Sequence, residues 1–188
     1  MQQESEGNIR AFVALPVAGD VKIRLAALQR ELGTRLHGAK WTSPAGLHLT
    51  IKFLGEISAP TVEMVITALD GMAAGPPFDL GFSRLGVFPD KGKARVLWIG
   101  SETGNAECVK LAGMVEKSME EVGFPREKRP FKAHLTLARF RIPSGIPGEV
   151  LDSMTDIQPC AVDRVVLYRS VLKPSGAEYS EIHSIRLE

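Results

Sequence analysis

Residues 47–56 of the chain are LHLTIKFLGE, and the fold prediction starts from this stretch. Hydrophobic and polar side chains alternate along it with a period of two, which is typical of a β-strand with one buried face. Its two sides are formed by Leu47, Leu49, Ile51 and Phe53, and by His48, Thr50 and Lys52. We therefore expect a strand that presents a histidine and a threonine, two residues apart, on a single face.

A second stretch repeats this pattern. Residues 132–139 are KAHLTLAR, so the HLTL of residues 134–137 matches the HLTI of residues 48–51 at three positions and keeps an aliphatic residue at the fourth. From average residue usage, a chance second His-Leu-Thr in a chain of this length has a probability on the order of a few per cent. The repeat predicts two symmetric lobes that each present one motif to a common cleft, although a motif this short does not establish a duplication by itself.

The rest of the chain mixes helices and strands without a regular alternation. We expect strands over 10–15, 47–56, 78–88, 94–99, 132–139, 161–172 and 178–187, and helices over 21–35, 61–72, 105–122 and 149–154. Asp20, Ser58 and Asn105 are the expected helix caps. Residues 37–44 are expected to form a loop and residues 89–93 a hairpin turn. This order favours an α+β fold with largely antiparallel sheets over a doubly wound parallel sheet.

The two motifs offer the groups that opening a cyclic phosphate ester requires. The reaction needs a base that deprotonates water and an acid that protonates the leaving ribose oxygen. Histidine, with an unperturbed pKa near ~6.5, can serve as either. Thr50 and Thr136 can donate hydrogen bonds to the non-bridging phosphate oxygens. A lone histidine on a strand is more often structural than catalytic, so the prediction of a catalytic pair, His48 and His134, depends on the repeat.

A metal site is the competing chemical interpretation. Zinc sites need three or four convergent nitrogen, sulfur or carboxylate ligands, and neither motif has a carboxylate at close spacing. The chain has no HExxH motif, no pair of CxxC motifs and no GxxxxGK[ST] loop. Cys108 and Cys160 lie far apart and suit reduced, packed thiols. We therefore expect neither a metal nor a cofactor.

Positive charge is concentrated around the second motif. Residues 126–141 hold six basic side chains and one acidic side chain, a local charge of +5 in a chain whose net charge is +1. This stretch is either a landing patch for an RNA end or a solvated loop. Arg139 follows the second motif on the same strand and is predicted to bind the phosphate, because a guanidinium can contact two phosphate oxygens at once.

Three further side chains are candidates for substrate contacts. Lys52 shares the alternation face of His48 in the predicted strand. Phe12 and Trp41 offer aromatic rings on which a base can stack, and packing in the core is the alternative for both. The two remaining histidines, His37 and His183, lack the repeated pattern, so we assign neither a role.

Composition indicates one soluble globular domain over residues 1–188. Hydrophobic residues make up 44% and charged residues 24%, which is ordinary for a folded protein. The net charge of +1 argues against a protein that coats a long polyanion, so a nucleic-acid partner should be bound locally, at an end or a short segment. A polar N-terminus and the lack of any apolar run of about 18 residues predict a cytoplasmic protein with no membrane contact. We expect no obligate protein partner.

These segments resemble the two-histidine (2H) phosphoesterase superfamily, and within it the bacterial and archaeal RNA 2′,3′-cyclic phosphodiesterases formerly named 2′-5′ RNA ligases. The resemblance extends over nearly the whole chain. It rests on RAFVALPV (10–17), LHLTIKFLGE (47–56), GVFPDKGKARVLWIG (86–100), RPFKAHLTLAR (129–139) and VVLYRSVLKPSGAEYSEI (165–182). It implies a bilobal fold with pseudo-two-fold symmetry, in which each lobe contributes one HxTx motif to a central cleft.

The resemblance also implies an activity and a set of roles. The activity is metal-independent hydrolysis of a terminal 2′,3′-cyclic phosphate to a 2′-phosphate, and the partners are RNA ends or nucleotides with that group. His48 is implied as the proton donor to the departing 3′ oxygen and His134 as the base that acts on water. Thr50, Thr136 and Arg139 are implied to hold the phosphate. Reversible 2′-5′ RNA ligation is an implied side reaction.

Two other functions stay open on the sequence. The same groups would suit a phosphodiesterase that acts on a small cyclic nucleotide such as ADP-ribose cyclic phosphate. A non-catalytic module that binds RNA ends belongs to a different class of protein. The two titratable side chains argue against such a module, because binding alone does not require them.

Overall fold

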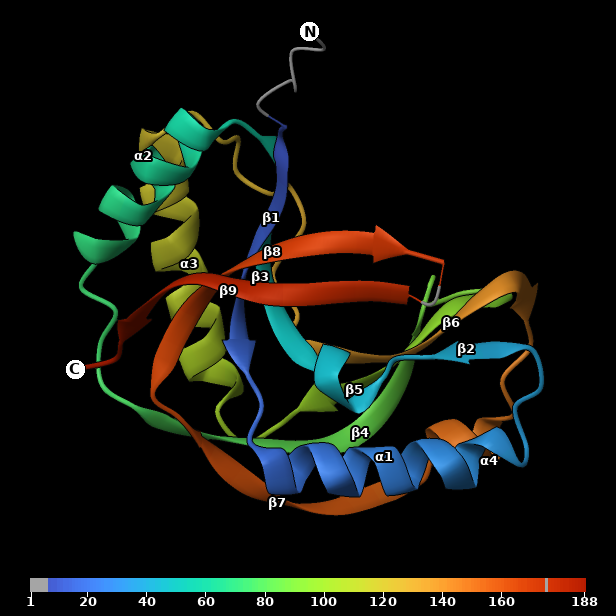
Figure 1. Ribbon diagram of the computed structural model, residues 1–188. Helices are drawn as coiled ribbons and strands as arrows, with labels where there is room; N and C mark the ends of the chain where they lie inside the picture. The colour runs from blue at the N-terminus through green and yellow to red at the C-terminus, as the bar shows by residue number, and fades with distance from the viewer. Residues whose placement is uncertain (1–6, 175) are drawn as a thin grey trace, which may run out of the picture.

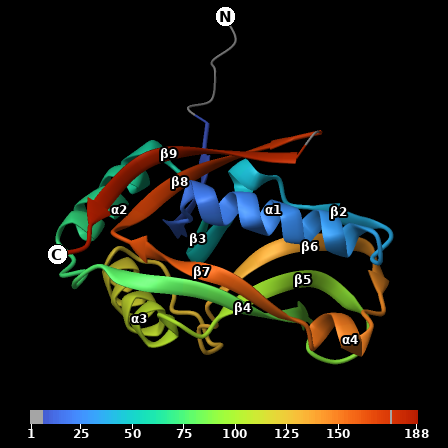
Figure 2. The same cartoon turned by 90° about the horizontal axis from the view of Figure 1, so that it is seen from below.

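The computed structural model describes residues 7–174 and 176–188, which form two antiparallel β-sheets flanked by helices (Figure 1, Figure 2). The first sheet has the strand order β3-β1-β8-β9 and the second has the order β2-β6-β5-β4-β7. The strands are β1 Ile9–Pro16, β2 Ala39–Trp41, β3 His48–Ile57, β4 Phe78–Phe88, β5 Ala94–Ser101, β6 His134–Ser144, β7 Met154–Val162, β8 Arg164–Lys173 and β9 Gly176–Arg186. The antiparallel pairing confirms the predicted α+β class.

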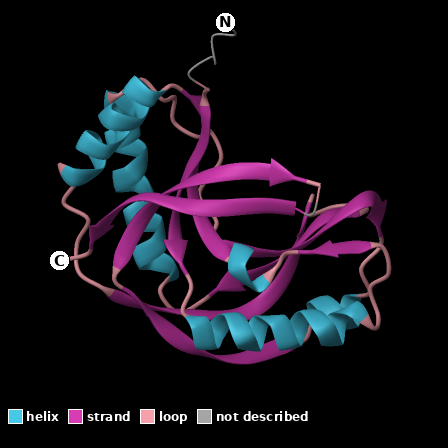
Figure 3. Ribbon diagram, in the orientation of Figure 1, coloured by secondary structure: helices cyan, strands magenta, loops and turns pink. Residues whose placement is uncertain are grey.

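Helices pack around the two sheets at separate places (Figure 3). They are α1 Gly19–Gly33, the 3-10 helix η1 Pro44–Gly46, α2 Ala59–Asp70, α3 Asn105–Glu121 and α4 Gly148–Leu151. Helix α2 contacts α3 and β9, α3 contacts β3, and α1 contacts β7 and η1. One hydrophobic core joins these elements, with side chains from both sheets and from the three long helices.

The two strands that carry the motifs correspond to each other position by position. From the histidine onward, residues 48–56 of β3 and residues 134–142 of β6 show the same sequence of buried and exposed side chains. A β-bulge interrupts the pairing of β3 with β1 at Ile51, and the pairing of β6 with β5 at the equivalent residue, Leu137. In this correspondence β3 and β1 of the first sheet match β6 and β5 of the second.

The bulge at Ile51 corrects the strict alternation expected for residues 47–56. Beyond Ile51 the side chains change sides, so Phe53 is exposed, whereas Lys52 and Leu54 are buried. In β6 the same shift leaves Arg139 exposed. A bulge sets two residues of one strand opposite a single residue of its neighbour, and alternation alone does not reveal it.

The structure corrects two of the three predicted helix caps. Asp20 lies inside the first turn of α1 instead of capping it. Helix α3 begins after Gly104 and not after Asn105. Gly104 has a φ of 78°, and a Cβ added there would lie 2.2 Å from the carbonyl oxygen of Asp79, so only glycine fits. The prediction for α2 is confirmed, because the hydroxyl of Ser58 accepts a hydrogen bond from its first turn.

The structure contains two strands, β2 and β7, that the sequence analysis did not predict as separate strands. Trp41 lies in β2, which pairs with β6, and not in a loop. The predicted strand over 161–172 is divided at Asp163, and β7 precedes the break and pairs with β4. Strand β7 contains Pro159, and a proline within a run argues against a strand except at the edge of a sheet. β7 occupies such an edge. The predicted helix over 149–154 is the short α4.

A buried glutamine attaches α1 to the second sheet. The side-chain amide of Gln29 donates hydrogen bonds to the carbonyl oxygens of Thr42, at 2.8 Å, and of Leu137, at 2.9 Å. The carbonyl of Leu137 also accepts a hydrogen bond from the backbone N–H of Thr42. Because Leu137 is the bulged residue of β6, these bonds support the bulge that leaves Arg139 exposed.

Candidate active site

The two motif histidines line one cleft. His48 is the first residue of β3 and His134 the first residue of β6, and these two strands contact each other across the sheets. The cleft has a volume of about 1840 Å³ and is lined by both sheets, by α3 and by the loop of residues 125–132. All the side chains predicted for the site line it: Phe12, Trp41, His48, Thr50, Lys52, His134, Thr136 and Arg139.

The backbone orients both imidazoles in the same way. The Nδ1–H of His134 donates to the carbonyl oxygen of Lys132 at 2.7 Å, which leaves Nε2 as the nitrogen available to a substrate. The ring of His48 is hydrogen-bonded to the backbone of Gly46. In both half-sites the partner lies two residues before the histidine. Such a bond selects the tautomer and the ring orientation of a histidine.

Aromatic rings pack against each histidine from its own sheet. Tyr179 of β9 meets His48 edge-on, with ring centroids 4.9 Å apart, and Phe12 of β1 lies 4.7 Å from the same ring. Phe88 of β4 meets His134 edge-on at 5.0 Å. These neighbours exclude water from part of each imidazole and restrict its rotation.

The pKa values of both histidines lie below the ordinary range. Burial lowers the pKa of His48 to about 4, because it disfavours the charged ring, and it lowers the pKa of His134 for the same reason. The guanidinium of Arg139 contributes to the lowered pKa of both rings. Both rings and Arg139 line the same cleft. Both rings are therefore mainly neutral at pH 7 in the unliganded protein.

Replacing Arg139 by alanine should raise the pKa of both His48 and His134, because it removes a positive charge that acts on each ring. NMR titration of the imidazole Hε1 resonances measures the two pKa values separately. Arg139→Lys keeps the charge, so both pKa values should stay near those of the unmodified protein. A rise in only one of the two pKa values would contradict the shared position of Arg139.

A second cation faces Arg139, and the sequence analysis did not single it out. Lys40 of β2 is the cross-strand neighbour of Arg139, and both side chains line the cleft. Like charges opposite each other on a sheet repel. Neither side chain has an ion-pair partner within residues 7–174 and 176–188. This pair, the cationic arm, suits the binding of an anion.

Lys52 lies in the wall of the cleft and is engaged by the protein itself. It is 3% exposed, and its ammonium donates to the carboxylate of Glu116 at 2.7 Å and to the carbonyl oxygen of Pro125 at 2.9 Å. The same carboxylate oxygen accepts a hydrogen bond from the backbone N–H of Glu127. Lys52 and Glu116 therefore fasten the loop of residues 125–132 to β3 and α3.

The two aromatic candidates differ in their access to the cleft. Phe12 is 2% exposed and stacks on Tyr168 at a centroid distance of 5.3 Å, so its ring is mainly covered by protein. Trp41 is half-buried, and its indole lies against Gly33 of α1. Phe12 thus packs behind His48, and Trp41 is the more accessible of the two rings.

Sequence reasoning singled out Phe12 but missed two other aromatic neighbours of the histidines, Phe88 and Tyr179. Phe88 ends a predicted strand just before the hairpin turn, and Tyr179 lies in the last predicted strand. Neither is close to a motif along the chain, so only the pairing of the strands brings them to the site. His37 and His183 do not line the cleft. Nε2 of His183 lies 2.6 Å from a carboxylate oxygen of Asp70.

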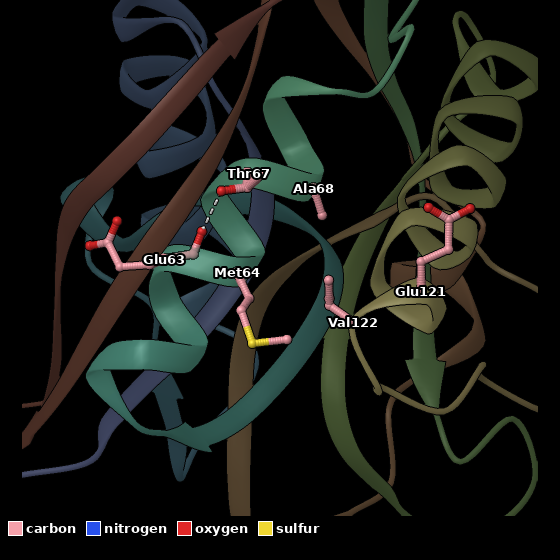
Figure 4. A pocket seen from close by; sticks show the side chains of 6 residues that line it. All are labelled: Glu63, Met64, Thr67, Ala68, Glu121 and Val122. Carbon is pink, nitrogen blue, oxygen red and sulfur yellow. Dashed lines mark hydrogen bonds between the residues drawn. The ribbon is translucent and has the colours of Figure 1, made fainter.

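A smaller hollow of about 430 Å³ lies between α2 and α3, away from the motifs (Figure 4). Its lining includes the acidic side chains Glu63 and Glu121 and the apolar side chains Met64 and Val122. The hydroxyl of Thr67 donates to the backbone carbonyl of Glu63 at 2.9 Å. Two carboxylates repel a phosphate, and no histidine lines this hollow, so the phosphate chemistry suggested by the motifs belongs to the large cleft.

No three His, Cys, Asp or Glu side chains gather as a metal site would require anywhere in residues 7–174 and 176–188. Cys108 and Cys160 are buried thiols without a disulfide partner. Burial raises the pKa of both, that of Cys108 to about 12. In the part of the chain that the structure describes, no helix combines the length and the hydrophobicity needed to cross a lipid bilayer.

Known proteins are similar to this chain over nearly its whole length. The family model for LigT like phosphoesterases matches residues 15–98 and again residues 99–179, with one motif in each segment. An RNA 2′,3′-cyclic phosphodiesterase of Archaeoglobus fulgidus is 30% identical and aligns over 93% of this chain and 98% of its own length.

Solved structures agree with these relatives on the fold. The crystal structure of TT0787 of Thermus thermophilus has a TM-score of 0.82 at 27% identity, over 95% of this chain and 98% of its own. The crystal structure of E. coli LigT complexed with 3′-AMP has a TM-score of 0.80 at 23% identity, over 96% of this chain and 98% of its own. Both share the arrangement of two sheets described above.

Proposed function

Because the chain belongs to the LigT-like phosphoesterase family, we propose that it hydrolyses terminal 2′,3′-cyclic phosphates of RNA to 2′-phosphates, with His48 as the acid and His134 as the base. The observation that carries the proposal is that both motif histidines, both motif threonines and Arg139 line a single cleft. The activity named for the relative from Archaeoglobus fulgidus supports RNA as the substrate class.

The proposed reaction uses one water molecule and two proton transfers. Nε2 of neutral His134 accepts a proton from water while the water oxygen attacks phosphorus, and the bond between phosphorus and the 3′ oxygen breaks. Protonated His48 donates its proton to that oxygen. The product has a 3′ hydroxyl and a 2′-phosphate. Exchange with solvent then returns a proton to His48 and removes one from His134.

The threonines and the cationic arm would hold the phosphate during this step. Thr50 and Thr136 lie two residues beyond the histidines on the same strand faces, so their hydroxyls can donate to the non-bridging oxygens. Arg139 can offer two N–H groups to one phosphate. These donors act where negative charge develops, and none of them needs a metal ion.

Substrate binding would supply the protonated state of His48. With a pKa of about 4, about one ring in a thousand is charged at pH 7 in the unliganded protein. An anionic phosphate beside the ring favours the imidazolium and raises this pKa. Arg139 opposes protonation of both rings, so it keeps His134 in the neutral form that a base needs and does not by itself distinguish the two roles. Binding of the substrate would therefore promote protonation of His48, the proposed acid.

The same groups support ligation as a side activity. If the 5′ hydroxyl of a second RNA end replaces water as the nucleophile, the step joins the two ends through a 2′-5′ phosphodiester. In the reverse direction the two histidines exchange roles. We include this reversible ligation in the proposal.

Incubation with an RNA oligonucleotide that ends in a 2′,3′-cyclic phosphate tests the proposed function. The expected product carries a 2′-phosphate, identified by chromatography against 2′- and 3′-phosphate standards. Turnover should continue in excess EDTA, because no proposed step requires a metal. Loss of turnover in EDTA, with recovery on addition of zinc or manganese, would contradict the metal-free mechanism. Binding of a 2′-phosphate end without turnover of the cyclic form would indicate a binding module instead.

A comparison of substrates of different size distinguishes an enzyme that acts on RNA from one that acts on small cyclic nucleotides. The same assay compares the oligonucleotide with a nucleoside 2′,3′-cyclic phosphate and with ADP-ribose cyclic phosphate. A higher kcat/KM on the oligonucleotide is expected, because Arg126 and Arg129 of the loop line the same cleft and can bind further phosphates. A preference for either small substrate would favour the alternative function.

A further inference from the structure

The carbonyl oxygens that orient the two motif histidines are held in place by different means. In the first half-site, Gly46 ends the 3-10 helix η1, and its N–H closes that turn with a hydrogen bond of 2.9 Å. In the second half-site, Lys132 belongs to the stretch between α3 and β6, which forms neither helix nor strand. The next carbonyl, of Ala133, accepts a long hydrogen bond of 3.4 Å from the N–H of Ser101. The position of the Lys132 carbonyl therefore depends on what holds the side chain of this residue.

The side chain of Lys132 is placed by two aromatic rings. Its ammonium lies 4.3 Å from the centroid of the Trp98 ring and 5.6 Å from that of Phe88. A cation over the face of an aromatic ring is attracted by the ring's quadrupole, and tryptophan attracts it most strongly. Lys132 forms no ion pair with a carboxylate within residues 7–174 and 176–188. The indole of Trp98 is therefore the main attachment of this ammonium.

The second sheet has room for the indole because two glycines lie beneath it. Trp98 of β5 is paired with Gly86 of β4, where an added Cβ would lie 2.1 Å from the indole. A Cβ at Gly100 would lie 2.9 Å from the same ring. The indole is 6% exposed, and its N–H has no hydrogen-bond partner among the described residues. A buried indole N–H usually has a partner, so packing on the faces of the ring fixes its position.

The same rows of the sheet lead to the second motif. Trp98 is paired with Thr136 of β6, and Gly100 is paired with His134. The centroids of the indole and the imidazole are 6.0 Å apart, and the ring planes meet at 65°. Lys132 and His134 line the cleft, whereas Trp98 does not. The indole thus lies behind the site, where it can act on the reaction only through its neighbours.

We propose that Trp98 and Lys132 are positioning residues for His134: the indole holds the ammonium of Lys132, and the carbonyl of Lys132 thereby keeps the imidazole proton on Nδ1. This inference rests on the proposed function, in which Nε2 of His134 accepts a proton from water. The hydrogen bond from Nδ1–H to the carbonyl is 2.7 Å long. A carbonyl that moved with a free loop would let the ring rotate or exchange tautomers. An imidazole with its proton on Nε2 cannot accept another there.

Kinetic constants on a 2′,3′-cyclic phosphate test this arrangement. Lys132→Gln and Trp98→Leu should each lower kcat by roughly fivefold or more and leave KM within about twofold, because a smaller fraction of molecules then has an oriented base. Lys132→Arg keeps a cation that stacks on an indole, so it should retain most of kcat. Lys93→Gln is the control, because it removes an exposed lysine outside the cleft lining, and it should change neither constant.

The double variant distinguishes positioning from two other roles of these side chains. In the Trp98→Leu background, Lys132→Gln should have little further effect on kcat, because the ammonium has already lost its attachment. Losses that multiply would overturn the proposal, since the two side chains would then act independently. A rise in KM with unchanged kcat in Lys132→Gln would overturn it as well, since Lys132 would then bind the substrate directly.

NMR of the imidazole nitrogens tests the arrangement without turnover. A long-range ¹H–¹⁵N correlation spectrum should show the proton of His134 on Nδ1 in the unmodified protein, and on both nitrogens in exchange in Lys132→Gln and Trp98→Leu. A proton that stays on Nδ1 in Lys132→Gln would overturn the proposal. Because Lys132 is exposed, this variant decides the matter even if Trp98→Leu does not fold. If the unmodified protein hydrolyses no cyclic phosphate, the proposed function fails, and the spectrum still tests the positioning separately.

Discussion

Replacing either His48 or His134 by asparagine is expected to lower kcat on a 2′,3′-cyclic phosphate by about 10²- to 10⁴-fold, the range for loss of one general acid or base. Asparagine retains a polar side chain that can form hydrogen bonds but cannot transfer a proton near neutral pH. Both imidazoles are only partly buried at the cleft, so the melting temperature should change little. Initial rates at saturating substrate measure the effect on kcat.

The pH dependence separates the two roles in these variants. A reaction that needs a protonated acid slows at high pH, and one that needs a neutral base slows at low pH. His48→Asn should therefore lose the decline at high pH, and His134→Asn the decline at low pH. His37→Asn is the control, because His37 is exposed and outside the cleft lining. Retention of full rate by either cleft variant would show that the acid–base pair is wrong.

Replacing Lys52 by methionine should destabilise the protein by about 3 kcal/mol, because it breaks a buried ion pair and leaves a carboxylate without its cation. The methionine variant also lacks the hydrogen bond from the ammonium of Lys52 to the carbonyl oxygen of Pro125, so one end of the loop of residues 125–132 loses an attachment. The carboxylate of Glu116 still accepts the hydrogen bond from the N–H of Glu127 and keeps some contact with solvent. The loss of stability should therefore lie at the lower end of the range for breaking a buried ion pair. Urea unfolding followed by circular dichroism measures the change.

Two further variants distinguish the buried pair from ordinary surface charges. Lys173→Met removes the lysine of an exposed ion pair with Glu178 and should change the free energy of unfolding by no more than about 0.5 kcal/mol. Lys52→Met combined with Glu116→Leu removes both buried charges and should regain much of the stability lost by Lys52→Met alone. Similar stabilities for Lys52→Met and Lys173→Met would refute the importance of burial.

The alternation of hydrophobic and polar residues was sufficient to predict the two motif strands. It did not predict which face the side chains beyond each β-bulge would occupy. Alternation placed His48 and Thr50 on one face, and the structure has them both in the cleft lining. The same alternation put Phe53 on the opposite face, because it carries no information about the extra residue at Ile51. That bulge depends on the pairing with β1, which is a property of the folded sheet.

Residues that reach the site from distant strands were beyond the sequence analysis for a different reason. Lys40, Phe88 and Tyr179 have no motif near them, and each meets the cleft only through strand pairing. The repeated motif compensates in part, since it predicts that its two copies face each other whatever lies between them. The fold class and the paired motifs were thus accessible to pattern, whereas their surroundings required coordinates.

The first sheet pairs strands that lie far apart along the chain, and this has a consequence for biosynthesis. Strand β1 leaves the ribosome long before its neighbour β8. Until then β1 has an unpaired edge, which is open to pairing with other chains. Tyr179, the edge-on neighbour of His48, also follows both motifs along the chain. A nascent polypeptide therefore displays both motifs well before the first of them acquires its finished surroundings.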